Sequence, residues 1–100
     1  MGIYIALLDF TDQGIRNLKD SPHRADQFTA MAEKAGAKVL VQYWTIGSHD
    51  GVLILEAPSE EVAASILLTL GASGSVRTTT LRAFEWADAQ GLIESRESKP

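Results

Sequence analysis

A short polar segment, Gly47 to Gly51 (GSHDG), carries the histidine and the acid with the clearest potential for chemistry. His49 could act as a base or proton shuttle, with Asp50 or another acid orienting its ring. Glycine, serine and aspartate are also typical turn residues, and adjacent residues on an extended strand point to opposite faces. The segment therefore favours a hairpin loop, and a catalytic role for His49 and Asp50 is the alternative.

Two aromatic residues, Tyr43 and Trp44, come shortly before this segment. Aromatic residues in a strand usually belong to the core, and that is the favoured interpretation. The alternative is a cavity wall, in which the Tyr43 hydroxyl takes part in chemistry and the Trp44 N–H reaches a ligand.

The segment 76–84 (VRTTTLRAF) is typical of a strand and carries arginine and threonine. Alternation along a strand places Arg77 and Thr79 on the same face. Buried groups of this kind need partners, and Asp9 and Glu56 are available acids on other strands. We favour an ion pair at the strand ends or across a subunit interface. The alternative is a ligand site in which Arg77 holds a carboxylate with two hydrogen bonds.

Composition argues against several classes of site. The absence of cysteine excludes disulfides, thiolate metal sites and cysteine nucleophiles. The two histidines lack metal-site spacing, and no phosphate-binding loop occurs, so we expect no metal and no cofactor. A net charge of −4 argues against nucleic-acid binding. The densest basic group (Arg16, Lys19 and Arg24) is interspersed with acids, as on a solvated surface.

The apolar runs are too short to span a bilayer, and the N-terminus lacks the basic and apolar regions of a signal peptide. We therefore expect no membrane association, and a cytoplasmic protein.

Hydrophobic periodicity predicts the order β-α-β-β-α-β. The strands are expected over 2–10, 38–46, 52–57 and 76–85, and the helices over about 21–35 and from Ser59 to Gly71. This is an α+β, ferredoxin-like βαββαβ arrangement, in which two helices cover one face of a four-stranded antiparallel sheet. Residues 1–86 would form this domain and residues 87–100 a partly disordered C-terminal tail.

Both faces of the predicted sheet are apolar, because alternate residues of the first and third strands are apolar at either parity. A large exposed apolar patch is a liability in a soluble protein. In 100 residues no segment remains to cover the second face. We therefore expect a homodimer, or a higher oligomer, with two sheets packed face to face about a two-fold axis.

Three stretches resemble the GYD family of small bacterial proteins over roughly residues 3–85: YIALLDFTDQGIRNLKDSPHRADQF, YWTIGSHDGVLILEAPSEEVAASILLTLG and GSVRTTTLRAF. The resemblance implies a ferredoxin-like fold assembled as a dimeric α/β barrel, and it implies no activity. The family takes its name from Gly, Tyr and Asp residues near the second hairpin. Asp50 matches the family's aspartate, and His49 stands where the family commonly has tyrosine.

Two functions are compatible with this sequence. The first is a homodimeric barrel that binds a small apolar ligand or serves as an accessory module, since no catalytic constellation is recognisable. The second is a small monooxygenase- or isomerase-like enzyme with a pocket between the sheet and the helices. The enzyme hypothesis requires an enclosed pocket contacted by His49, Tyr43 or Arg77.

Overall fold

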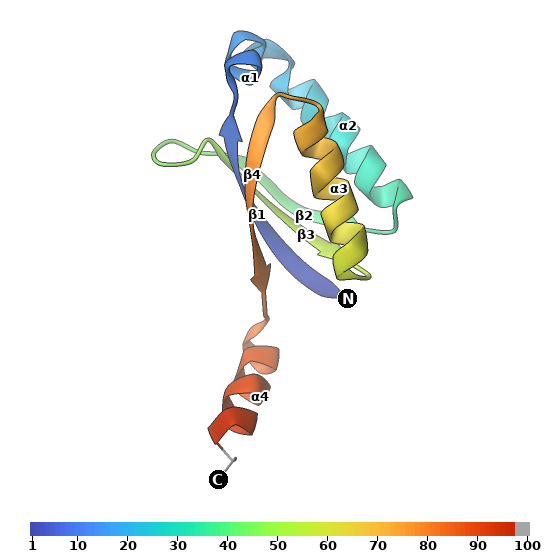
Figure 1. The fold of residues 1–100 in the computed structure, drawn as a ribbon, viewed down its shortest axis with the longest axis vertical. Coiled ribbons are helices and arrows are strands. Elements are labelled where there is room, and N and C mark those ends of the chain that lie inside the picture. The colour runs from blue at the N-terminus through green and yellow to red at the C-terminus, as the bar shows by residue number, and fades with distance from the viewer. Residues whose placement is uncertain (98–100) are drawn as a thin grey trace.

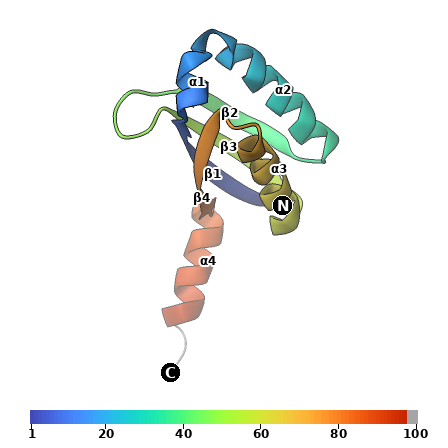
Figure 2. The same ribbon diagram turned by 45° about the horizontal axis from the view of Figure 1, so that its top comes forward.

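The computed structural model of the protein describes the fold of residues 1–97 and contains one antiparallel sheet (Figure 1). The sheet has four strands in the order β2-β3-β1-β4: β1 (Gly2–Phe10), β2 (Lys38–Trp44), β3 (Gly51–Ala57) and β4 (Val76–Ala83). Helices α2 (Ser21–Lys34) and α3 (Glu60–Ala72) lie side by side on one face of it (Figures 1 and 2). The predicted ferredoxin-like α+β fold is confirmed.

Local sequence signals set the ends of the two long helices. Ser59 caps α3, since its hydroxyl accepts a hydrogen bond from the Val62 N–H at 3.2 Å. Gly36 follows α2 with a φ of 88°, in the left-handed region that favours glycine. Gly71, however, is not the end of α3, because the helix continues to Ala72 and the left-handed residue of this turn is Gly74.

The hydrophobic core lies between the two helices and the central strands β1 and β3. Strand β3 alternates strictly between buried and half-buried residues, so every second residue faces the helices. Leu53, Leu55 and Ile66 are the largest fully buried side chains. Tyr4, Ala6, Phe28 and Ala32 complete the central part of this core.

Strand β2 contains a bulge that the sequence pattern did not reveal. Its register against β3 shifts between Val39 and Val41, so Leu40 is an extra residue. Simple alternation would place Val39, Val41 and Tyr43 on one face of the strand. The bulge reverses the alternation, so Val39 packs against the core while Val41 and Tyr43 lie on the opposite face.

A short helix, α1 (Asp12–Arg16), and a 3-10 helix, η1 (Leu18–Asp20), connect β1 to α2. Thr11 ties this connection to the loop before β4, since its N–H donates to Ser75 O and its hydroxyl to Gly74 O. Gly14 lies against the same loop, where a Cβ atom would overlap the backbone oxygen of Ser75. The glycine thus permits a close approach of two backbone segments.

The C-terminal segment differs from the expected tail, because Trp86–Glu97 forms helix α4. Figure 1 shows α4 projecting away from the sheet and from α2 and α3. Its Trp86, Leu92 and Ile93 side chains are all more than half exposed. The expectation of disorder for residues 98–100 lies outside the described residues, and the domain boundary at residue 86 stays a prediction. None of the helices in residues 1–97 is both long and apolar enough to cross a membrane.

Two glycine-to-alanine substitutions should change stability in opposite directions. Gly71→Ala should raise the free energy of unfolding by about 0.5–1 kcal/mol, because alanine has the higher helix propensity and the added Cβ meets no atom within 4 Å. Gly14→Ala should lower it by about 1–3 kcal/mol through overpacking. Urea denaturation measures both values. A Gly14→Ala variant as stable as the wild type would contradict the close approach to Ser75.

Candidate functional site

The face of the sheet opposite α2 and α3, here named the open face, carries rows of side chains that run across the strands. The strand registers align one wholly apolar row across all four strands: Val41, Ile54, Ile5 and Leu81. A second row consists of Tyr43, Val52, Leu7 and Thr79. The open face therefore has a continuous apolar centre that the described residues of this chain do not cover with a helix.

Charged residues flank this apolar centre at both ends of the open face. At one end Lys38 pairs in register with Glu56. At the other end Asp9 lies opposite Arg77, and His49 reaches Asp9 from the loop between β2 and β3. Asp9, His49 and Arg77 form what is termed here the polar end cluster. An apolar centre with a polar rim is the usual composition of a protein–protein interface.

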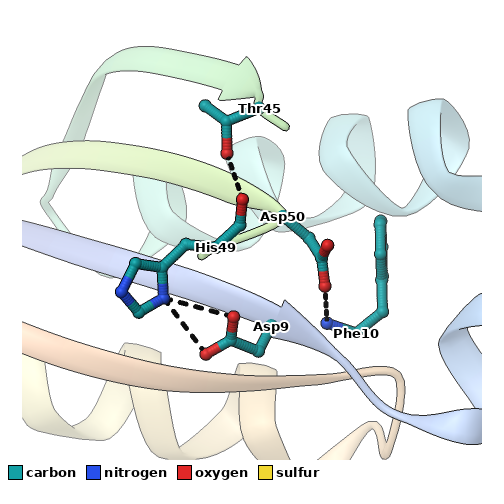
Figure 3. Close-up of polar contacts among 5 residues, drawn as sticks. All are labelled: Asp9, Phe10, Thr45, His49 and Asp50. Atoms are coloured by element: carbon teal, nitrogen blue, oxygen red, sulfur yellow. Dashed lines mark hydrogen bonds and ion pairs between the residues drawn. The ribbon is translucent and has the colours of Figure 1, made fainter. Parts of the chain in front are cut away.

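His49 and Asp9 form an ion pair if the imidazole is protonated, or a hydrogen bond if it is neutral (Figure 3). His49 Nδ1 lies 3.2 Å from Asp9 Oδ1 and 3.3 Å from Oδ2. The Thr45 hydroxyl donates to His49 O at 2.6 Å and braces the loop. Asp9 therefore orients the His49 ring, as an acid orients a catalytic base, although both side chains remain partly exposed.

Asp50 has a structural role in the same loop. Its Oδ2 accepts a hydrogen bond from the Phe10 N–H at 2.8 Å, and its own N–H donates to Leu8 O at 2.8 Å. Figure 3 shows the Asp50 carboxylate and the His49 ring pointing away from each other, towards different partners. Asp50 thus fastens the loop to the end of β1 and does not orient His49.

Trp44 faces the helices, on the opposite side of the sheet from Tyr43. Its Nε1–H donates to Ser21 Oγ at 2.9 Å. Two residues earlier, Gln42 Nε2 donates to Thr29 Oγ1 at 2.7 Å. These bonds hold the end of β2 against α2.

A half-open cavity of about 280 Å³ lies between α2, the end of α3 and the sheet. Trp44 and Asp50 line it, and Tyr43 borders it. His49, Arg77 and Thr79 do not line it. The candidate residues from the sequence are thus divided between two faces, and of the three polar groups that the enzyme hypothesis named, only Tyr43 contacts the cavity.

Sequence reasoning missed one cavity residue, Arg24, which had been assigned to a solvated surface. Arg24 is half-buried and lines the cavity from α2. The signal that could have found it is helical spacing, since Arg24 stands four and seven residues before Phe28 and Met31 and so shares their face of the helix. Within the described part of the chain no group of three or more His, Cys, Asp or Glu side chains is arranged to hold a metal ion.

The fold and the open face define an α+β domain of the ferredoxin-like class with an uncovered sheet face. A family model of the GYD domain matches residues 4–93, and the chain belongs to the GYD domain family. The matched residues include most of β1, all of the other three strands and part of α4.

A curated relative in Thermus thermophilus is named "Glutamine synthetase and cystathionine beta-lyase binding protein". It is 35% identical to this chain over 89 residues, which cover 88% of this chain and 94% of the relative. The chain is therefore similar, over nearly its full length, to a protein that is named for binding other proteins.

The different roles of the two loop residues predict different costs of substitution. Asp50→Ala should lower the free energy of unfolding by about 1–3 kcal/mol, because the Phe10 N–H loses a charged acceptor. His49→Ala should lower the free energy of unfolding by less than about 1 kcal/mol, since the pair of His49 with Asp9 is partly exposed. Chemical denaturation measures both. A larger loss for His49→Ala than for Asp50→Ala would reverse this assignment.

Proposed function

We propose that this protein is a homodimeric accessory protein that binds an enzyme. The observation that carries the proposal is the set of large apolar side chains left partly or largely exposed on two separate surfaces, the open face and α4. The similarity to a relative named for binding two enzymes supports the proposal that this protein binds an enzyme. The bacterial origin of that relative supports a bacterial setting, and the cytoplasmic location expected from the sequence is part of the proposal.

The open face is the proposed dimer interface. Its central row joins Val41, Ile54, Ile5 and Leu81 without a polar interruption. A second copy related by a two-fold axis would bury the same patch on both subunits. Lys38 and Glu56 at one end, and the polar end cluster at the other, would then form the rim of the interface.

Helix α4 is the proposed contact with the enzyme. It extends away from the sheet and presents Trp86, Leu92 and Ile93 to solvent. An amphipathic or partly apolar helix that projects from a domain suits docking into a groove of a partner. Tryptophan is also among the residues most often found at the energetic centre of an interface. The open face and α4 are separate surfaces, so one chain can form the dimer and bind the enzyme at the same time.

Direct binding tests the enzyme partner. Glutamine synthetase and cystathionine beta-lyase from the organism in which this protein occurs are the first enzymes to test, by biolayer interferometry on the immobilised full chain. At least one should bind saturably, and Leu92→Glu should weaken that binding about tenfold or more. Ala87→Glu is the matched control on the same helix and should bind as the wild type does. Failure of both enzymes to bind would contradict the proposed partner.

Thermal unfolding at several protein concentrations tests the dimer. If folding is coupled to dimerisation, the melting temperature of the wild type should rise with protein concentration. Ile54→Glu places a charge in the apolar row, so its melting temperature should be lower and independent of concentration. Leu68→Glu, on the exposed side of α3, should keep the dependence. A concentration-independent wild type would argue against the open face as an interface.

A further inference from the structure

We infer that the cavity between α2 and the sheet binds a small carboxylate with an apolar body, and that Arg24 holds the carboxylate. This site lies on the helix side of the sheet and is independent of the open face, α4 and the enzyme partner. Two observations support the inference. The Arg24 guanidinium has a buried nitrogen without a hydrogen-bond partner, and the side chains that line the cavity are mainly apolar.

Arg24 has an unused hydrogen-bond donor. Its Nη1 donates to Asn17 O at 2.9 Å, which fixes the guanidinium against the turn before η1. Its Nη2 is buried and has no hydrogen-bond partner among the described residues. Buried polar groups are nearly always hydrogen-bonded, and a donor on a charged group is especially costly to leave unpaired. Arg24 also forms no ion pair with any carboxylate in the described part of the chain.

Most of the other polar groups of the cavity wall already have partners within the protein. Ser21 and Trp44 bond to each other, and Gln42 donates to Thr29. Asp50 accepts from the Phe10 N–H at 2.8 Å, so its carboxylate is held at the β1 side of the cavity. Arg24 is therefore the group in this wall with a charge and an unpaired donor, and an anion is the chemistry that it would bind.

Most of the remaining wall is apolar. Leu8, Phe10, Phe28, Met31, Leu53 and Leu70 line the cavity from the sheet and both helices. A volume of about 280 Å³ lies just below the usual range for small-molecule sites, which is roughly 300–1,000 Å³, so the cavity suits a small ligand. An inorganic anion would leave this apolar surface unused. A monocarboxylate with an aromatic or branched aliphatic body would bury it and place its charged end on Arg24.

A titration followed by nuclear magnetic resonance tests the inference, with 3-phenylpropionate as the probe. Its uncharged amide, 3-phenylpropionamide, has the same shape and is the matched ligand control. Trp44 reports from the cavity wall, and its indole N–H signal is distinguished from that of Trp86 in a Trp86→Phe variant. The acid should shift the Trp44 signal saturably, with a Kd of about 0.1–10 mM for a ligand of this size. The amide should bind about tenfold or more weakly.

Substitution of Arg24 provides the second arm. Arg24→Gln should weaken binding of the acid about tenfold and leave binding of the amide unchanged. Arg16→Gln makes the same change on the exposed side of α1 and should have no effect. Equal affinity for the acid and the amide, or no saturable shift at Trp44, would overturn the inference. The comparison of the two ligands uses the wild-type residues around the cavity, so it decides the question even if Arg24→Gln fails to fold.

Discussion

The structure depends on one constraint: a four-stranded sheet is apolar on both faces, while α2 and α3 cover only one of them. On the covered face, the alternate residues of β1 and β3 that point towards the helices are buried beneath them and form the core. On the open face, the other set of alternate residues forms an apolar row from Val41 to Leu81, and the described residues of the chain do not cover it. Stability of the fold and association with another molecule are therefore consequences of the same strand composition.

The end of the sheet at the β2–β3 loop separates two environments. On the open face, the loop contributes His49, which pairs with Asp9 beside Arg77. On the helix side, Asp50 fastens the loop to Phe10 and helps to line the cavity that Arg24 enters. Neighbouring residues of a short loop thus serve different faces of the sheet. The proposed interface and the proposed ligand site are correspondingly independent.

Sequence reasoning was most successful where patterns are local. The order of the four strands and of α2 and α3 followed from apolar periodicity, and Ser59 marked the start of α3. It failed where long-range geometry decides: the bulge at Leu40 reversed the faces of β2, and the His49–Asp9 pair joins residues 40 positions apart. The orphaned donor of Arg24 depends on burial by distant segments. Helix α4 was missed because its polar end resembled a disordered tail.

Coverage of the open face by a second copy of the chain is the central claim, and the mass of the protein in solution tests it most directly. Sedimentation equilibrium of the wild-type chain at micromolar concentration should give at least twice the chain mass of 10.8 kDa. A dimer, or a larger assembly built from dimers, agrees with a sheet that pairs face to face. A stable monomer of 10.8 kDa at the same concentration would contradict the claim, because the apolar row would then remain in water.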